Sequence, residues 1–385
     1  MAHNTDVIVI GGGIMGTSAA FFLRRRGLRV TLIERFLVGQ QASGVNFGNV
    51  RGSNRFVPQY PLANRAMRIW ERLGELIGTR CEFIQSGRIQ IAVDEERLAL
   101  MERNAEAAAP YGLGIEVLSG KRVRALYPWF SDKVVAGSWA PHDGHANPRL
   151  VSPAFADAAR REGAQILENT RMASVEKHGD EFVVTTEDGQ EFRAAKVLVT
   201  AGAWAQKIAA DMGEPVPLVV RGPQLMVTEP VKYFMVPAVG VSTSNPEETV
   251  YFRQVERGNI VVGGGGARGP ASAEDMRAFV DPVNSLNQMR QVSKFVPQLK
   301  HVSVIRTWSG IESYLPDDIP VMGPSGKHGG LYYAFGFCGH GFQLGPGVGD
   351  VMAELIAEGR TETPLEPFHI SRFAEGQIEW KVPPK

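Results

Sequence analysis

The chain of 385 residues is 44% hydrophobic and 21% charged, and its 41 lysines and arginines balance its 41 aspartates and glutamates. This length is typical of one large domain or of two interleaved domains. Because the net charge is zero, we expect neither nucleic acid nor a membrane surface as a partner. The two cysteines, Cys81 and Cys338, are too few for a disulfide framework or a thiolate metal site. We also expect no signal peptide, no transmembrane segment and no metal, and therefore a cytoplasmic protein.

The first forty residues have the pattern of a dinucleotide-binding βαβ unit. Apolar runs and glycine punctuation predict a strand, a helix and a second strand over residues 6–10, 17–26 and 28–33. The sequence GGGIMG lies between the first strand and the helix. Gly11 permits a tight turn, Gly13 lets the backbone approach a pyrophosphate, and Gly16 lets helix and strand pack closely. The alternative is a glycine-rich turn between core elements.

An acidic residue, Glu34, stands at the end of the second predicted strand. A carboxylate at this position can accept hydrogen bonds from a ribose diol. It would repel a 2′-phosphate, so we do not expect NADP. Strand, turn, helix, strand and acid in this order make the dinucleotide interpretation stronger than the glycines alone would.

Four later segments resemble the FAD-dependent family that oxidises amines and amino acids. The family includes D-amino acid oxidase, glycine oxidase, sarcosine oxidase and the flavin subunits of opine and hydroxyproline dehydrogenases. The segments are QASGVNFGNVR at 41–51, TAGAW at 200–204, WSGIE with a following PD at 308–317, and GFCGHGFQLGPG at 336–347. The resemblance covers nearly the whole chain and is closest to sarcosine oxidase and the opine and hydroxyproline dehydrogenase branch. It implies FAD as the cofactor.

The resemblance also implies which residues hold FAD. The expected contacts are Gly11, Gly13, Ile14, Met15, Gly16, Glu34, Arg35, Ser43, Gly44, Asn46, Gly48, Val175, Ala201, Gly202, Trp204, Gly310, Gly339, His340, Gly341, Phe342 and Gln343.

We expect the cofactor to be bound non-covalently. Monomeric sarcosine oxidase attaches FAD through a cysteine six residues before its PD motif, and Gly310 stands at that position here. Cys338 lies far from this point in the chain, and we expect it to be a small packing residue.

The implied fold class is α/β, with a Rossmann-like FAD-binding domain interleaved with an α+β substrate domain that contains a mixed sheet. We assign to the FAD-binding domain residues 1–80, 141–222 and 305–385. We assign to the substrate domain residues 81–140 and 223–304. Further helices are predicted over residues 94–108, 148–163, 273–296 and 348–358. We expect the polar tail, residues 366–385, to be loosely packed.

The resemblance implies oxidation of a C–N bond by hydride transfer to flavin N5, after which the imine hydrolyses. The expected substrate is an amino acid, an N-substituted amino acid or an opine. Two carboxylate anchors known from relatives are missing, because Glu312 stands where some relatives have arginine and Gln343 where sarcosine oxidase has lysine. The remaining candidates for binding the carboxylate are Arg51, Arg55, Tyr251 and Arg253.

Each of these candidates has a structural alternative. The arginines can be surface charges, and Tyr251 can be a core residue. Glu312 can bind a cationic group of the substrate or form a buried ion pair. His340 can hydrogen-bond the flavin or the substrate, or it can pack within a turn. We take His340, Arg51, Tyr251 and Glu312 as the catalytic candidates, and we do not distinguish His142 and His145 from surface residues.

The electron acceptor is a separate question. The lysine that activates oxygen in sarcosine oxidase lies in the substrate sheet, and residues 250–266 contain no lysine. We therefore expect a dehydrogenase that uses another acceptor, or the flavin subunit of a heteromeric complex, although Arg253 or Arg257 could replace the lysine. The alternatives are a self-sufficient glycine- or sarcosine-type oxidase that forms hydrogen peroxide, and a non-catalytic FAD-binding electron-transfer subunit.

Overall fold

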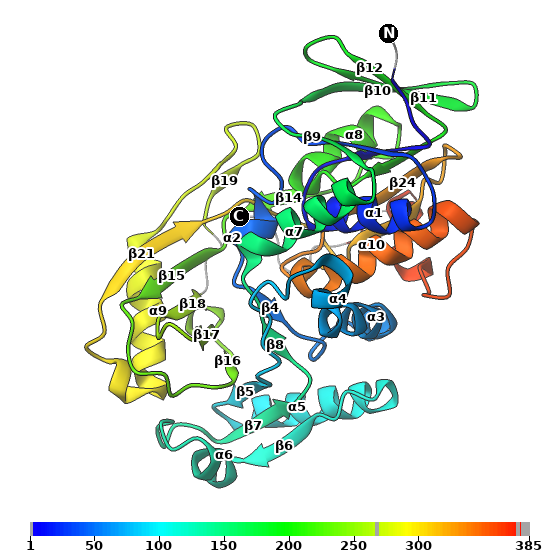
Figure 1. The fold of residues 1–385 in the computed structure, drawn as a ribbon. Coiled ribbons are helices and arrows are strands. Elements are labelled where there is room, and N and C mark those ends of the chain that lie inside the picture. The colour runs from blue at the N-terminus through cyan, green and yellow to red at the C-terminus, as the bar shows by residue number, and fades with distance from the viewer. Residues whose placement is uncertain (1–2, 266–268, 375–377, 379–385) are drawn as a thin grey trace.

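The structure is a computed structural model that describes residues 3–265, 269–374 and 378, and its N-terminal region has the predicted βαβ order (Figure 1). The unit consists of β2 (Val7–Ile10), α1 (Ile14–Arg25) and β3 (Val30–Ile33). Gly11 has a φ of +107°, and a Cβ there would lie 2.6 Å from the carbonyl oxygen of Thr200. A Cβ on Gly16 would lie 1.9 Å from the Gly11 carbonyl oxygen. The turn therefore requires glycine at both positions, once for conformation and once for close packing.

A six-stranded sheet with the order β23-β24-β13-β2-β3-β9 contains this unit. Its neighbouring strands are parallel, except that β23 runs antiparallel to β24. The other strands are β9 (Gln165–Leu167), β13 (Lys196–Val199), β23 (Val321–Pro324) and β24 (Leu331–Phe335). The carboxyl ends of β2, β13 and β24 meet at one edge, where ligands of α/β sheets bind.

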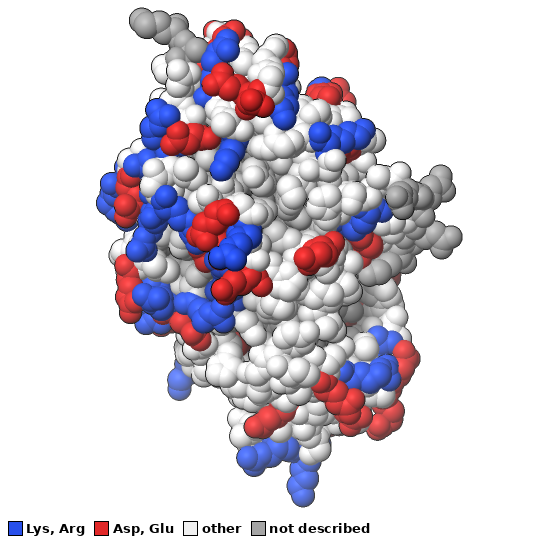
Figure 2. All heavy atoms as spheres, turned by 90° about the vertical axis from the view of Figure 1, so that its right-hand side faces the viewer, with Lys and Arg blue, Asp and Glu red and all other residues white. Residues whose placement is uncertain are grey.

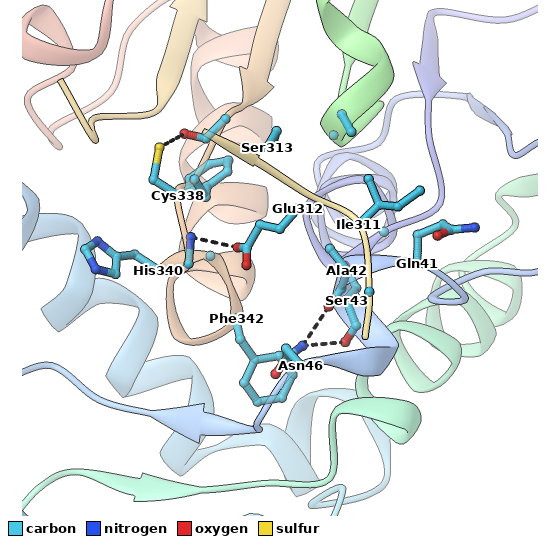
Figure 3. A pocket seen from close by; sticks show the side chains of 18 of the residues that line it. Gln41, Ala42, Ser43, Asn46, Ile311, Glu312, Ser313, Cys338, His340 and Phe342 are labelled. Carbon is cyan, nitrogen blue, oxygen red and sulfur yellow. Dashed lines mark hydrogen bonds between the residues drawn. The ribbon is translucent and has the colours of Figure 1, made fainter. Parts of the chain in front are cut away.

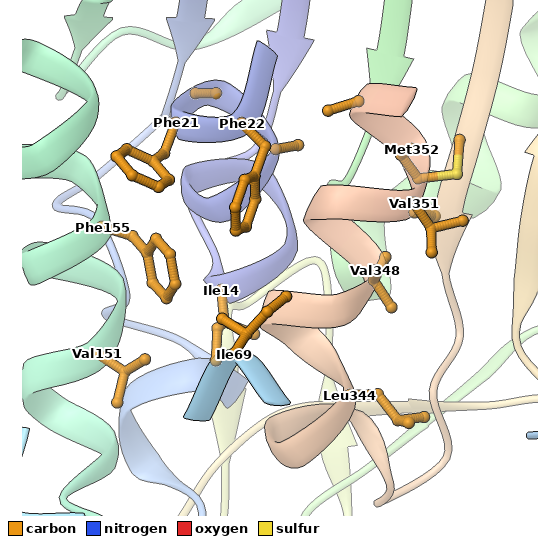
Figure 4. Packing of buried hydrophobic residues seen from close by; sticks show 14 of the residues in the cluster. Ile14, Phe21, Phe22, Ile69, Val151, Phe155, Leu344, Val348, Val351 and Met352 are labelled. Carbon is orange, nitrogen blue, oxygen red and sulfur yellow. The ribbon is translucent and has the colours of Figure 1, made fainter. Parts of the chain in front are cut away.

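Helices cover one face of this sheet and a second sheet covers the other. The helices next to the sheet are α1, α7 (Pro148–Arg161) and α10 (Gly341–Glu358), while α3 (Tyr60–Glu71) packs on α10 and α4 (Leu73–Ile77) on α7. Figure 4 shows Phe21 and Phe22 of α1 facing Phe155 of α7, with the apolar side chains of α10 on the other side. The opposite face packs against α8 (Ala205–Asp211) and a sheet of β1 (His3–Asn4), β12 (Glu191–Ala194), β11 (Glu181–Thr186) and β10 (Met172–His178).

The helix α10 begins earlier than predicted. We expected a helix over 348–358, but α10 starts at Gly341 and contains Pro346. A Cβ on Gly345 or Gly349 would lie within 2.6 Å of atoms of α1, and one on Gly347 would lie 2.7 Å from Ala66 of α3. The glycines thus allow three helices to approach closely, and this packing outweighs the poor helix propensity of the segment.

The second large unit is an eight-stranded mixed sheet with the order β21-β15-β18-β17-β16-β5-β7-β6, drawn at the lower left of Figure 1. Only β16 and β5 are parallel among its neighbours. Its strands are β5 (Arg88–Ala92), β6 (Glu116–Ser119), β7 (Ala136–Ala140), β15 (Gln224–Thr228), β16 (Ala238–Ser242), β17 (Val250–Gln254), β18 (Ile260–Gly264) and β21 (Val304–Ser309).

The two faces of this sheet differ in polarity because side chains alternate along each strand. On β5, Ile89 and Ile91 point into a core that also contains residues of α9 (Pro282–Phe295). Arg88 and Gln90 line the cleft on the other side. The sheet therefore has one apolar face for its own core and one polar face toward the six-stranded sheet.

Short elements join the two units. The strands β4 (Asn49–Val50) and β8 (Gly144–His145) pair antiparallel, as do β14 (Val219–Arg221) with β22 (Glu312–Tyr314) and β19 (Ala271–Ser272) with β20 (Arg277–Ala278). The remaining helices are α2 (Ala42–Val45), α5 (Glu95–Ala108) and α6 (Gly120–Leu126). The 3-10 turns are 57–59, 109–111, 202–204, 246–248, 297–299, 366–368 and 370–373.

Three expectations need adjustment. The helix α9 starts at Pro282 rather than 273, because the β19–β20 hairpin occupies the preceding residues. The strand β21 pairs in the eight-stranded sheet, although the predicted domain division places residues from 305 onward with FAD. The first part of the tail is not loosely packed, since Phe368 and Ile370 are buried. Residues 375–377 and 379–385 of the tail lie outside the described residues.

The surface has no dominant charge on the face that Figure 2 shows, where basic and acidic side chains are intermixed. No helix within the described ranges is long and apolar enough to cross a membrane. The predicted α/β fold with an interleaved mixed sheet is confirmed.

The contact between α10 and α1 can be tested with Gly349→Ala. The new Cβ would lie 2.2 Å from Ser18 Oγ and 2.6 Å from the Ala19 nitrogen. Despite the better helix propensity of alanine, we expect overpacking to lower the apparent free energy of unfolding by about 1–3 kcal/mol in urea denaturation. Gly329→Ala is the control, because a Cβ there would have no neighbour within 4 Å. Equal denaturation midpoints for the two variants would contradict the assigned role of this contact.

Candidate functional site

A cleft of about 1080 Å³ lies between the carboxyl edge of the six-stranded sheet and the polar face of the eight-stranded sheet. Segments that are far apart in the sequence line it, among them 10–15, 33–55, 200–204, 310–314 and 334–342. Figure 3 shows how the loop with Ser43 and Asn46 faces the loop with His340 and Phe342 across this space. The volume is at the upper end of the range for small-molecule and cofactor sites.

The carboxylate of Glu34 lies at the wall of the cleft and is held by two backbone donors. The Gly12 N–H donates to Oε2 at 2.6 Å and the Phe36 N–H donates to Oε1 at 2.8 Å. A carboxylate has about four acceptor positions, so capacity for a ribose diol remains. Next to it, the Arg35 guanidinium lies 4.5 Å from the centre of the Trp204 ring and connects two of the predicted cofactor segments.

Two helix N-termini open into the same cleft. Gly13 is the N-cap residue of α1 and His340 that of α10, and neither helix has an acidic residue in its first turn. The Ile14 N–H of α1 donates to Ser43 Oγ at 2.9 Å. Free backbone donors and the helix dipole favour negative charge at such ends. The cleft therefore offers two places for anionic groups of a ligand.

The loop after β3 is shaped by its own side chains. The Asn46 amide nitrogen donates to the carbonyl oxygens of Ala42 at 3.0 Å and Ser43 at 2.8 Å (Figure 3). The Gly48 N–H donates to Asn46 Oδ1 at 2.7 Å. Trp308 Nε1 donates to the Val45 carbonyl oxygen at 2.8 Å and ties this loop to β21. The loop is thus fixed against the substrate sheet.

The structure leaves little room for a covalent flavin link. A Cβ on Gly310 would lie 2.1 Å from Val45 Cγ2. Cys338 is buried, accepts a hydrogen bond from the Leu315 N–H and donates one to the Gly336 carbonyl oxygen. Burial raises the pKa of the Cys338 thiol to about 12. A thiol that stays protonated is a poor nucleophile.

Most of the predicted cofactor residues line the cleft, and five lie outside its wall. Gly16, Gly44 and Gly48 are close-packed against backbone oxygens of neighbouring segments. Val175 lies in β10, beyond the strand residues that reach the cleft, and packs against the core that includes Phe182. Gln343 is 1% exposed inside α10. These five residues support the packing of the segments that line the cleft, and their contact with a cofactor remains a prediction.

Three arginines form the most unusual part of the cleft wall. Arg51 is half-buried, and Arg55 and Arg88 are each 8% exposed. Burial is the main cause that lowers the pKa of each guanidinium, and that of Arg88 falls to about 10. Repulsion from Arg51 lowers the pKa of the other two further. None of the three forms an ion pair with a carboxylate of the described residues.

Asp143 is the acid that partly balances this cluster. It is 1% exposed and opposes the lowering of the pKa in all three arginines. Its carboxylate is bound by the Gly52 N–H at 2.7 Å and by the N–H and hydroxyl of Ser53. One acid thus faces three guanidinium groups.

Two other catalytic candidates, Glu312 and His340, have different environments. Glu312 lines the cleft, where its Oε1 accepts from the Gly339 N–H at 2.7 Å (Figure 3). Its Oε2 accepts from the Tyr314 hydroxyl at 3.2 Å. His340 also lines the cleft and its carbonyl oxygen accepts a hydrogen bond of 3.4 Å from Arg55. Glu312 therefore holds the loop that ends at His340 in place.

Tyr251 and Arg253 lie on the same strand, but only the first of them lines the cleft. Tyr251 lines the cleft and packs edge-on against Phe47, with ring centres 4.8 Å apart. Arg253 does not line the cleft. Its guanidinium donates to the carbonyl oxygens of Phe47 and Ala146 and contacts His145 Nδ1 at 3.3 Å. Arg253 is thus a structural arginine that attaches the β4–β8 pair to the sheet.

The two histidines of the 142–145 loop do not reach the cleft. His145 is buried beside Arg253, and burial followed by repulsion from that arginine lowers its pKa to about 3. His142 offers its carbonyl oxygen to the Gln85 side chain. Neither belongs to the site.

Sequence reasoning missed Arg88, Gln90 and Asp143. The alternation of Arg88 and Gln90 with two isoleucines was a usable signal, because in a strand it places both polar side chains on one face. Asp143 stands in an irregular loop, where the sequence gives no indication of burial.

The family profile described as DAO, FAD dependent oxidoreductase, matches residues 6–355. The chain belongs to this family. FAD is therefore its cofactor, and the prediction of a DAO-family flavoprotein is confirmed.

Known DAO-family proteins are similar over nearly the whole chain. Glycine oxidase of Geobacillus kaustophilus is 26% identical over 97% of this chain and 98% of its own length. An opine oxidase subunit of Rhizobium meliloti is 25% identical over 98% of this chain and its full length. Human mitochondrial sarcosine dehydrogenase is 28% identical over 97% of this chain, which spans 42% of that protein. The structure of L-proline dehydrogenase from P. horikoshii superimposes with a TM-score of 0.90 at 28% identity, covering 98% of this chain and all of that one.

The residues present fit FAD. The carboxylate of Glu34 is available for the ribose, and the N-terminus of α1 is suited to the pyrophosphate. The N-terminus of α10 opens into the cleft and suits the electron-rich side of the flavin ring. The individual contacts remain predictions.

Removing the Glu34 carboxylate should weaken FAD binding. In Glu34→Ala the ribose acceptor and the anchor of the Gly12 and Phe36 amides are lost together. We expect a loss of about 1.5–3 kcal/mol in binding free energy, measured as the FAD dissociation constant of the reconstituted apoprotein. Glu34→Gln, which keeps the shape and one acceptor, should lose less. Equal FAD retention by wild type and both variants would contradict the ribose assignment.

The mode of attachment can be tested by acid precipitation of the purified protein. Because Gly310 leaves no space for a linking side chain and Cys338 stays protonated, we expect all flavin in the supernatant and a colourless pellet. Flavin absorbance that remains with the denatured chain would show a covalent bond and contradict this prediction.

Proposed function

We propose that the protein oxidises the C–N bond of an amino acid or N-substituted amino acid, whose carboxylate is bound by the arginine cluster of Arg51, Arg55 and Arg88. The observation that carries this proposal is a set of three guanidinium groups on the cleft wall that form no ion pair with a described carboxylate and share Asp143 as their balancing acid. Guanidinium groups recognise carboxylates bidentately, and a buried one requires an anion. The cluster replaces the arginine and lysine anchors that are missing at Glu312 and Gln343.

The chain holds one of these arginines rigidly. Arg55 donates to the Arg51 carbonyl oxygen at 2.6 Å and to Gln343 Oε1 at 2.8 Å. The Gln343 amide nitrogen is itself fixed to the Ala63 carbonyl oxygen at 2.9 Å. Gln343 is thus a positioning residue, which holds Arg55 close to the N-terminus of α10. A preorganised clamp binds its ligand with a smaller loss of entropy.

An aromatic pair on the cleft wall supplies shape. Tyr251 and Phe47 form an aromatic corner, and Gly263 leaves room for the Tyr251 ring, since a Cβ there would lie 2.3 Å from it. When bound, FAD supplies the hydride acceptor. The protein then needs to orient the C–H bond and exclude water, and a substrate amine that binds neutral requires no general base.

We favour a dehydrogenase that transfers electrons to another acceptor. Among the described residues that line the cleft, one is a lysine, Lys207 on α8. It lies in the region of Trp204 and Arg35. Arg253, which could have replaced the oxygen-activating lysine, is engaged away from the cleft. The opine oxidase relative is named as one subunit of its enzyme, which supports a role for this chain as the flavin subunit of a larger complex. A self-sufficient oxidase is the alternative.

Anaerobic reduction of the bound flavin tests the proposal. We expect amino acids or N-substituted amino acids to bleach the flavin absorbance of the purified protein, whereas the corresponding amines without a carboxylate do not. Air added to the reduced protein should restore the colour slowly and yield little peroxide. Fast peroxide formation would favour the oxidase. Absence of bleaching by any compound of a panel of D-amino acids, N-alkyl amino acids, cyclic imino acids and opines would favour a non-catalytic subunit.

A further inference from the structure

The charge of the arginine cluster exceeds what a single carboxylate can balance. Arg51, Arg55 and Arg88 carry three positive charges, and Asp143 is the acid that acts on all of them. Two positive charges of the cluster thus remain without an acid that acts on all three arginines. Burying unpaired charge is unfavourable, and a monocarboxylate would balance only one of the two.

We propose that the substrate is a dicarboxylate amine, with one carboxylate at Arg55 and Arg51 and the second at Arg88. This inference rests on the proposed function and names the substrate class of the same site. N-(carboxyalkyl) amino acids have this chemistry, because their nitrogen bears two carboxylate arms.

The three arginines reach the cleft from two different parts of the fold. Arg51 and Arg55 belong to the loop after β4, and Arg55 lies beside Gln343 at the start of α10. Arg88 comes from the strand β5 of the eight-stranded sheet. Two separate origins suit two anionic groups on one ligand better than a single doubly charged group.

The position of Arg88 is built into the sheet. Its hydrogen-bond acceptor among the described residues is the side chain of Gln90, so most of its five N–H donors have no protein acceptor. The neighbouring strand carries Gly240, where a Cβ would lie 2.3 Å from Arg88 Nη2 and 2.2 Å from Gln90 Oε1. Glycine at this position clears the space that both polar side chains occupy.

Two ethers test the charge requirement without oxidation. Ethoxyacetate and diglycolate differ only by a methyl group in place of a carboxylate, and neither contains an amine. We expect diglycolate to bind the FAD-loaded protein at least about tenfold more tightly than ethoxyacetate does. Calorimetry and the shift of the flavin spectrum measure both affinities. Equal or weaker binding of diglycolate would overturn the proposal. Tighter binding of (ethoxymethyl)phosphonate, which has both charges on one group, would also overturn it.

Variants locate the second carboxylate. Arg88→Met should reduce the affinity ratio of diglycolate to ethoxyacetate to about one. Arg88→Lys, which keeps the charge, should retain part of the preference. Arg97→Met is the control, because this arginine on α5 is already paired with Glu96 and its loss should leave the ratio unaltered. A ratio that Arg88→Met does not change would overturn the assignment. If Arg88→Met does not fold, the affinity ratios of the wild type and of Arg88→Lys still test the proposal.

Anaerobic bleaching separates this inference from the proposed function. N-ethylglycine and iminodiacetate form the matching pair of amines. If both bleach the flavin with the same apparent affinity, the dicarboxylate inference fails and the proposed function stands. If diglycolate binds tightly and no amine of either kind bleaches the flavin, the proposed function fails.

Discussion

The close packing of α10 against α1 is the contact on which the rest of the structure depends. Gly345 and Gly349 remove the side chains that would separate the helices, and Ser18 Oγ of α1 donates to the Gly345 carbonyl oxygen at 3.0 Å. Because the two helices follow strands of one parallel sheet, both N-termini then open into one cleft. A dinucleotide that spans from ribose to flavin ring can contact both ends only in this arrangement.

The same helix start organises the substrate side. Gln343 lies in the first turn of α10 and connects it to the Ala63 backbone of α3 and to the Arg55 guanidinium. Trp70 Nε1 donates to the Gln343 carbonyl oxygen at 2.8 Å, so the residue is fixed from both sides. A substitution that shifts α10 would therefore move the cofactor site and the arginine cluster together.

The parts of the molecule that could be predicted from the sequence are those whose conformation is determined by neighbouring residues. The strand–turn–helix order around Gly11 and the acid at Glu34 follow from short-range rules, and the residues that the resemblance named for the cofactor mostly line one cleft. The start of α10 could not be predicted, because its glycines and Pro346 suit a loop until α1 and α3 provide the packing. The role of Arg253 was equally hidden. It lies on the same strand as the cleft-lining Tyr251, yet the β4–β8 pair captures its guanidinium.

The arginine cluster shows why the substrate side resists prediction more than the cofactor side. The predicted cofactor contacts are largely backbone groups, which glycine spacing reveals, whereas the proposed substrate contacts are side chains that come from different elements. Arg55 and Arg88 are buried without an ion pair to a described carboxylate, and Asp143 balances only part of the cluster's charge, which lowers the stability of the ligand-free protein. Such local losses of stability are typical of binding sites. A bound ligand supplies the missing charge and raises the free energy of unfolding by mass action. The arginine cluster differs from a structural arginine such as Arg253 in its place, because its guanidinium groups line the cleft whereas that of Arg253 donates to backbone acceptors outside it. For this reason we infer that the charge of the cluster reflects its ligand.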